Sequence, residues 1–264
     1  MSVRTIEVNG ISTRIIEKGQ GVPVLFLHGN PDNAEEWNKV IDLLQQECRC
    51  IAIDLPGFYH STIPSDYDFS VDSQVRFVDA LIATLELEKK IVIVAHDIGA
   101  VMGVAWAATR PERVRGLVVM NTVYHRDYHW HVLARIWAIP ILGRLSMMIP
   151  ERVFINAFRK TSPNLETEEI RRIYQGITVN TKRSILRLYR KMVKPEFFVE
   201  WDDRMAEITR HVPSMVIWGK QDSLIPSSYA QRIGPNVRML EQSNHWVPLE
   251  APDEIANNVR RFLR

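Results

Sequence analysis

Hydrophobic and polar residues follow one another along this chain in two different rhythms. Short apolar runs rich in β-branched residues predict buried strands, because a strand covered on both faces has few polar positions. These runs are residues 24–27, 49–54, 91–95, 114–120, 214–218 and 237–240. The segments between most of them carry apolar residues at helical spacing, most clearly in 71–87. This alternation predicts a mainly parallel sheet covered by helices.

The N-terminal segment has its own pattern. Residues 3–8 and 13–17 alternate like strands on either side of Asn9-Gly10, a dipeptide that favours tight hairpin turns. We therefore expect an antiparallel hairpin at the start of the chain. Together with the six apolar runs, it brings the predicted sheet to eight strands.

The strand rhythm stops between residues 123 and 205. This segment is rich in aromatic and aliphatic residues and is interrupted by prolines, which is typical of several helices rather than of a linker. It falls between the sixth and the seventh predicted strand. We therefore expect a core domain of residues 1–122 and 206–264, with a helical cap of residues 123–205 lying over the strand ends.

Composition narrows the class of partner. The chain has 264 residues, 46% of them hydrophobic, with 33 Lys and Arg against 31 Asp and Glu. A formal net charge of +2 gives no strong field for nucleic acid or an anionic membrane, so a small-molecule partner is expected. The first residues enter a strand pattern without the features of a signal peptide, and no apolar run reaches about 18 residues. These features predict a cytoplasmic protein.

The stretch 91–103 carries the most informative motif. An apolar strand runs into Ala95-His96-Asp97-Ile98-Gly99 and then into a helical pattern. Small residues two before and two after Asp97 match a nucleophile elbow, a strand-to-helix turn that presents a strained residue. Asp97 therefore occupies the place of a nucleophile.

Two further polar residues follow predicted strands. Asp222 and His245 each come shortly after one of the last two strands, and the carboxyl ends of parallel strands meet at one edge of a sheet. Nucleophile, acid and His is also the chain order of α/β-hydrolase triads. Two rivals for the acid are position 121, where Asn121 cannot supply charge, and Asp127 in the cap. We expect Asp97, His245 and Asp222 to form a catalytic triad.

An Asp nucleophile implies covalent chemistry at an sp3 carbon. A carboxylate is ionised near neutral pH and needs no base to attack, which leaves His245 free to activate water. Attack on a carbon that bears a leaving group forms an alkyl ester of Asp97, and its hydrolysis passes through an oxyanion. The backbone N–H groups of Asn30 and Ile98 are expected to bind that oxyanion. This chemistry needs no metal and no cofactor.

Four motifs together resemble one branch of known hydrolases. They are His28-Gly29-Asn30-Pro31, AHDIGA around Asp97, WGKQD ending at Asp222, and SNHW around His245. Over nearly the whole chain, this combination resembles the haloalkane dehalogenase and epoxide hydrolase branch of the α/β-hydrolase superfamily. The resemblance implies an α/β-hydrolase fold, an Asp nucleophile and a small, largely apolar substrate.

The resemblance also implies donors for the leaving group. Asn30 matches one halide donor of such dehalogenases, whereas the second, a Trp directly after the nucleophile, is replaced by Ile98. An epoxide hydrolase would use cap tyrosines instead. The cap candidates are His129, Trp130 and Trp137 as substitute halide donors, and Tyr124, Tyr128, Tyr174 and Tyr189 as hydroxyl donors.

Three functions stay open at this point. Cleavage of a carbon–halogen bond ranks first, on Asn30 and the cap, and opening of an epoxide to a diol ranks second. A ligand-binding protein on a hydrolase scaffold ranks third, because such proteins often lack a triad member. The expected partners are a small-molecule substrate and water, and the sequence leaves the oligomeric state open.

Overall fold

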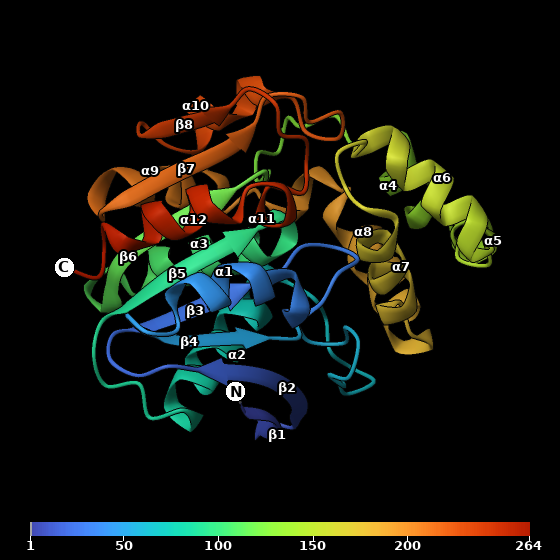
Figure 1. Cartoon of the computed structure of the whole chain (residues 1–264). Coiled ribbons are helices and arrows are strands. Elements are labelled where there is room, and N and C mark those ends of the chain that lie inside the picture. The colour runs from blue at the N-terminus through green and yellow to red at the C-terminus, as the bar shows by residue number, and fades with distance from the viewer. Residues whose placement is uncertain (1) are drawn as a thin grey trace.

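The predicted strands form one eight-stranded sheet in the computed structural model, which describes residues 2–264 (Figure 1). The strands are β1 (Ser2–Val8), β2 (Ile11–Lys18), β3 (Pro23–Leu27), β4 (Arg49–Ile53), β5 (Ile91–His96), β6 (Val114–Met120), β7 (Ser214–Gly219) and β8 (Val237–Leu240). Their order in the sheet is β1-β2-β4-β3-β5-β6-β7-β8. All neighbours are parallel except β1 with β2 and β2 with β4. The expected mostly parallel sheet is confirmed.

The predicted hairpin joins β1 and β2. Val8 pairs with Ile11 across the Asn9-Gly10 turn. Both turn residues have positive φ, +48° and +76°, which a tight hairpin turn requires and which Asn and Gly adopt most easily.

Helices cover both faces of the sheet (Figure 1). One face carries a 3-10 turn (Ala34–Trp37), α1 (Asn38–Leu44), α11 (Val247–Glu250) and α12 (Pro252–Arg260). The other face carries α2 (Val71–Thr84), α3 (Asp97–Thr109), α9 (Asp202–His211) and α10 (Ala230–Ile233).

Successive residues of a central strand belong to different cores, because side chains alternate across a strand. In β3, Leu25 and Leu27 share a core with α2 and α3, while Val24 and Phe26 share one with α1 and α12. All four side chains are fully buried. Burial on both faces explains the uninterrupted apolar runs from which these strands were predicted.

A group of helices inserted after β6 forms the cap, at the right of Figure 1. It contains α4 (Val132–Ala138), α5 (Pro140–Ser146), α6 (Glu151–Thr161), α7 (Thr167–Gly176) and α8 (Val179–Met192). The expected insertion after the sixth strand is thus confirmed. The boundary proposed at residue 205 falls inside α9, which packs against α3 and β7. None of the helices in residues 2–264 combines the length and the hydropathy needed to cross a bilayer.

Candidate active site

The turn between β5 and α3 has the geometry of a nucleophile elbow. Asp97 has a φ of +49°, in the left-handed region that non-glycine residues avoid. A Cβ on Gly99 would lie 2.5 Å from the backbone oxygens of Leu27 and His28, so only glycine lets α3 approach β3 this closely. The Thr122 hydroxyl donates to the Asp97 carbonyl oxygen at 2.7 Å. These constraints hold Asp97 at the carboxyl edge of the sheet.

His245 and Asp222 lie together at the same edge. His245 Nδ1 is 2.9 Å from Asp222 Oδ2, and both side chains are almost fully buried. Asp222 Oδ1 accepts from the backbone N–H groups of Leu224 and Ile225, and Oδ2 accepts from the side-chain amide of Asn121 at 2.7 Å. The residue weighed as a rival acid position therefore supports Asp222.

The opposite charges of Asp222 and His245 shift their pKa values in opposite directions. Burial opposes the ionised form of Asp222, but the nearby His245 outweighs it and lowers the pKa of Asp222. Burial likewise opposes the imidazolium, but Asp222, with a further contribution from Asp97, raises the pKa of His245 to about 9. The raised pKa favours the imidazolium form of His245 beside the Asp222 carboxylate.

The loop after β3 brings Asn30 into contact with Asp97. Its backbone N–H donates to Asp97 Oδ2 at 2.9 Å, and its side-chain amide donates to the Tyr189 hydroxyl at 3.2 Å. Ile98 lies in the first turn of α3, where backbone N–H groups have no intrahelical acceptor. Its side chain is 5% exposed and lines a separate, smaller cavity. Ile98 therefore offers the site a backbone donor and no side-chain donor.

A buried Glu36–His96 pair supports this loop. Glu36 accepts from the Gly29 N–H at 2.7 Å, and its other oxygen lies 2.6 Å from His96 Nδ1. His96 Nε2 donates to the His245 carbonyl oxygen at 3.0 Å, since a carbonyl can only accept. Burial raises the pKa of the Glu36 carboxyl, and the neighbouring His96 opposes this shift. The pair connects the loops that carry Asn30 and His245.

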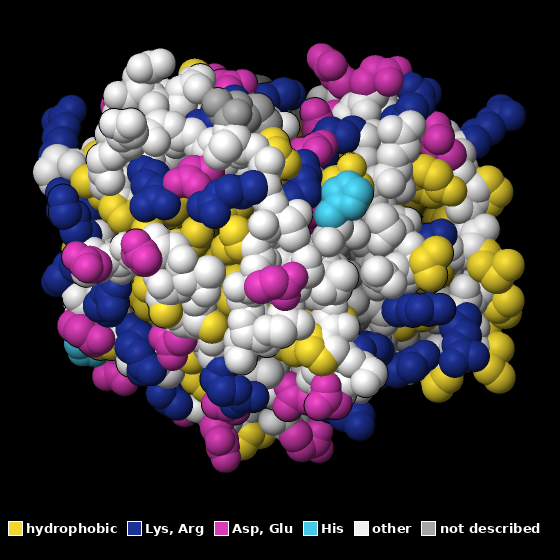
Figure 2. Space-filling view, turned by 90° about the horizontal axis from the view of Figure 1, so that it is seen from below, with side chains coloured by type: hydrophobic (Ala, Val, Ile, Leu, Met, Phe, Trp, Pro, Cys, Tyr) yellow, Lys and Arg dark blue, Asp and Glu magenta, His cyan; other side chains and the backbone are white. Residues whose placement is uncertain are grey.

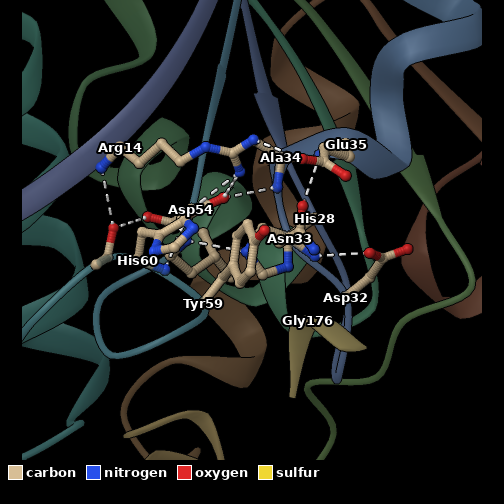
Figure 3. Close-up of polar contacts among 12 residues, drawn as sticks. Arg14, His28, Asp32, Asn33, Ala34, Glu35, Asp54, Tyr59, His60 and Gly176 are labelled. Carbon is tan, nitrogen blue, oxygen red and sulfur yellow. Dashed lines mark hydrogen bonds and ion pairs between the residues drawn. The ribbon is translucent and has the colours of Figure 1, made fainter. Parts of the chain in front are cut away.

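Two charged contacts hold the rest of the loop, and Figure 3 shows the first of them, between Arg14 and Asp54. The fully buried Asp54 carboxylate accepts from the Arg14 guanidinium and from the backbone N–H of Ala34. Arg172 of α7 donates to both carboxylate oxygens of the buried Asp32 at 2.8 Å. The second contact connects the cap to the loop beside Asp97.

A cavity of about 190 Å³ lies over Asp97, between the sheet edge and the cap. Asp97 and His245 both line it, and the rest of its wall is mostly aromatic and aliphatic. Wall residues include Trp130, Leu133, Trp137, Met147, Phe154, Phe158, Ile185, Leu224 and Trp246. The lining suits a small molecule with an apolar body. No group of three or more His, Cys, Asp or Glu side chains in residues 2–264 is arranged to hold a metal ion.

Two of the cap candidates lie outside this cavity. Tyr124 lies in the segment between β6 and α4 and is buried in the core, where its hydroxyl is 3.3 Å from backbone carbonyl oxygens of α9 and α10. His129 is exposed and lines a separate surface hollow, while its neighbours Tyr128 and Trp130 face the cavity. Packing turns the side chains of Tyr124 and His129 away from Asp97, so the structure does not bring these two candidates to the cavity.

The remaining cap tyrosines differ in what their hydroxyls bind. Tyr128 donates to the Leu224 carbonyl oxygen at 2.8 Å and Tyr174 to the Ile149 carbonyl oxygen at 3.2 Å. The Tyr189 hydroxyl accepts from Asn30 and has no carbonyl acceptor among residues 2–264. Of these three side chains lining the cavity, Tyr189 is therefore the one whose O–H is free to donate into it.

Sequence reasoning missed three residues of this region. Glu36 precedes Val40 and Leu44 at intervals of four, a spacing that indicated a buried face. His96 is part of the elbow motif, but its contact with Glu36 joins distant segments. His131 caps α4 and lines the cavity, and burial lowers its pKa. No sequence pattern pointed to His131.

Comparison with known proteins extends these observations. A family model described as alpha/beta hydrolase fold matches residues 22–252. A haloalkane dehalogenase of Agrobacterium fabrum is 35% identical over 43% of this chain, an alignment that spans 37% of that relative. A cis-3-alkyl-4-alkyloxetan-2-one decarboxylase of Shewanella oneidensis is 26% identical over 97% of this chain and 86% of its own length.

A solved structure agrees along the whole chain. The crystal structure of an ancestral haloalkane dehalogenase superposes with a TM-score of 0.81 at 26% identity, covering 98% of each chain. The family model spans the elbow, the loop after β3 and the segments that carry Asp222 and His245. This chain therefore belongs to the alpha/beta hydrolase family.

Proposed function

We propose that this protein hydrolyses a small apolar substrate through a covalent alkyl ester on Asp97, with haloalkanes as the first substrate class. One arrangement carries the proposal: a carboxylate on a strained elbow, a backbone donor on it, and a buried His245–Asp222 pair, all beneath an apolar cavity. Ester substrates are disfavoured, because acyl transfer to a carboxylate would give an anhydride.

The reaction takes two steps. An Asp97 oxygen attacks the sp3 carbon, so that a C–O bond forms and the halide leaves with the electrons of the C–X bond. His245 then takes a proton from water, and the hydroxide attacks the ester carbonyl carbon, forming an oxyanion that the Asn30 and Ile98 backbone N–H groups stabilise. Collapse releases the alcohol, protonated by His245, and Asp97 returns to its carboxylate by losing a proton to solvent.

The charge on Asp97 connects the two steps. In the free enzyme, Asp222 and Asp97 together overcome burial and raise the pKa of His245 to about 9. Alkylation removes the negative charge of Asp97, so the pKa of His245 falls in the alkyl-enzyme. A larger fraction of His245 therefore loses its proton to solvent, and the neutral imidazole can then take a proton from water once there is an ester to hydrolyse.

Donors for the departing halide come from the loop and the cap. Asn30 has a second N–H on its amide, and Tyr189 beside it has a free O–H. The indole rings of Trp130 and Trp137 pack against Tyr189, with ring centroids 5.8 Å and 4.8 Å away. In this proposal these groups take over from the Trp that relatives carry at the position of Ile98.

Epoxide opening is the second candidate, and the Tyr189 hydroxyl favours it. The oxygen of an opening epoxide becomes an alkoxide, which an O–H donor stabilises directly. Burial and the charge of Asp97 raise the pKa of Tyr189 well above 10, so its proton is retained near neutral pH. Attack by the same carboxylate would also open the C–O bond of an oxetan-2-one, the substrate class in the name of the Shewanella relative.

Trapping the covalent ester tests the proposal. In His245→Gln, alkylation should proceed while hydrolysis stalls, so intact-protein mass spectrometry should detect an adduct after exposure to substrate. A haloalkane should add its alkyl group without the halogen, whereas an epoxide or an oxetan-2-one should add its whole mass. Peptide mapping should place the adduct on Asp97, and Asp97→Asn/His245→Gln should form none.

His129→Gln is the matched control, since this exposed His lies outside the cavity. It should turn over substrate without accumulating adduct. An adduct from haloalkanes alone, or from epoxides alone, decides between the two classes. Absence of an Asp97 adduct with all three substrate types contradicts the covalent mechanism, and saturable binding without an adduct would support a ligand-binding protein.

A further inference from the structure

The cap carries an exposed apolar surface. Of the twelve large hydrophobic side chains exposed in residues 2–264, eight lie between residues 132 and 153. They are Val132, Leu133, Ile139, Ile141, Leu142, Leu145, Met148 and Val153, and we call them the cap patch. Figure 2 shows hydrophobic side chains gathered at the right-hand edge, on the side of the molecule where Figure 1 places the cap helices. This concentration is typical of an interaction surface.

The unpaired charged side chains among the residues of the cap patch are all positive. Arg135, Arg144 and Arg152 are exposed there, one on each of α4, α5 and α6, and none has a carboxylate within ion-pair distance among residues 2–264. Glu151, the acidic residue of this segment, is bound to Arg171 of α7. Residues 123–205 as a whole carry 15 Lys and Arg against 9 Asp and Glu. The cap segment is therefore more basic than the net charge of +2 for the whole chain indicates.

The same helices form part of the cavity wall. Leu133 of α4 and Phe154 of α6 line the cavity over Asp97, as does Met147 directly after α5. Leu133 is 44% exposed and belongs to both surfaces. The segment thus has the apolar cavity on one side and the cap patch on the other.

We propose that the cap patch binds the surface of an anionic lipid bilayer, with the three arginines at the headgroups and the apolar side chains in the interfacial layer. A second copy of this chain fits less well, because a symmetric contact would bring the same unpaired arginines face to face without carboxylates. Docking in this way sets the apolar cavity beside a phase in which apolar molecules dissolve. The proposal does not depend on the chemistry at Asp97.

Vesicle sedimentation with the full chain tests this proposal. The protein should co-sediment with vesicles of phosphatidylcholine and phosphatidylglycerol, less with phosphatidylcholine alone, and binding should weaken as salt is added. Arg135→Gln/Arg144→Gln/Arg152→Gln should lower the affinity about 100-fold, at about 5-fold for each arginine. Ile141→Ser/Leu142→Ser/Leu145→Ser should abolish binding while circular dichroism and thermal unfolding stay unchanged, because all three side chains are exposed.

Matched variants remove equivalent side chains elsewhere. Val3→Ser/Leu43→Ser/Val199→Ser takes away exposed apolar residues outside the cap patch, and Arg76→Gln/Lys89→Gln/Arg261→Gln takes away exposed charges. Both should bind vesicles like the unchanged protein. Equal loss in these controls, or no binding to anionic vesicles, overturns the proposal. A dimer in sedimentation velocity would also overturn the proposal if Ile141→Ser/Leu142→Ser/Leu145→Ser dissociates it and vesicles bind neither the unchanged protein nor this variant.

Discussion

Replacing Tyr189 by Phe isolates the cap hydroxyl that is free to donate into the cavity. Tyr189 is 3% exposed, its oxygen lies 3.2 Å from Asn30 Nδ2, and its ring packs against Trp137 with centroids 4.8 Å apart. Phe keeps the ring and its packing. The substitution therefore removes one O–H donor and one partner of Asn30, and little else.

The size of the effect follows from the charge on the leaving group. A hydrogen bond to a charged group contributes about 1.5–3 kcal/mol, so alkylation of Asp97 should slow about 10- to 150-fold. Hydrolysis of the ester takes place after the leaving group has gone, so its rate constant should change less than about 3-fold. Loss of the contact with Asn30 should lower the free energy of unfolding by about 1 kcal/mol.

Rapid-quench mass spectrometry in the His245→Gln background measures alkylation alone, and urea unfolding measures stability. Tyr128→Phe and Tyr174→Phe are matched controls, because both residues line the cavity but donate to backbone carbonyls. They should affect stability more than alkylation. Unchanged alkylation in Tyr189→Phe, or equal slowing in both controls, would refute the assignment of Tyr189 as the leaving-group donor.

Four further predictions concern pH and stability. Ester hydrolysis in single turnovers should slow as the pH falls through the pKa of His245 in the alkyl-enzyme, which should lie below the value of about 9 in the free enzyme; a flat profile from about pH 5 to 9 would contradict this. Because that free-enzyme pKa is raised, the charged His245 stabilises the fold fully below about pH 6.5, and thermal unfolding should show this contribution fading as the pH rises through about 9. Gly99→Ala should cost about 3 kcal/mol or more in urea unfolding, whereas Gly10→Ala, with no atom near its Cβ, should cost about 1 kcal/mol for its positive φ; similar losses would argue against a steric limit at the elbow. Arg172→Met should cost about 3–5 kcal/mol, because it leaves the buried Asp32 carboxylate without its cation, and Asp32→Asn/Arg172→Met should recover part of that loss; no recovery would show that packing alone is responsible.

Patterns along the chain were enough to predict the sheet and its edge. Strands buried on both faces need continuous apolar runs, and an elbow needs small neighbours around Asp97, so both leave a local signature. The place of Asp222 and His245 followed from parallel topology, which gathers strand ends at one edge. The structure brings His245 and Asp222 within 2.9 Å of each other there, although their catalytic roles stay a prediction.

The cap shows where local pattern stops being informative. Tyr124, Tyr128, Tyr174 and Tyr189 have the same chemistry, and helical periodicity does not say which face of a short cap helix meets Asp97. Tertiary packing placed Tyr124 in the core and left the Tyr189 O–H free in the cavity that Asp97 also lines. The Glu36–His96 contact and the cap patch likewise depend on how separate segments pack. The sequence by itself determined the scaffold and the elbow that carries Asp97, because each depends on neighbours in the chain. Only the tertiary structure decided which cap side chains line the cavity, because that depends on neighbours in space.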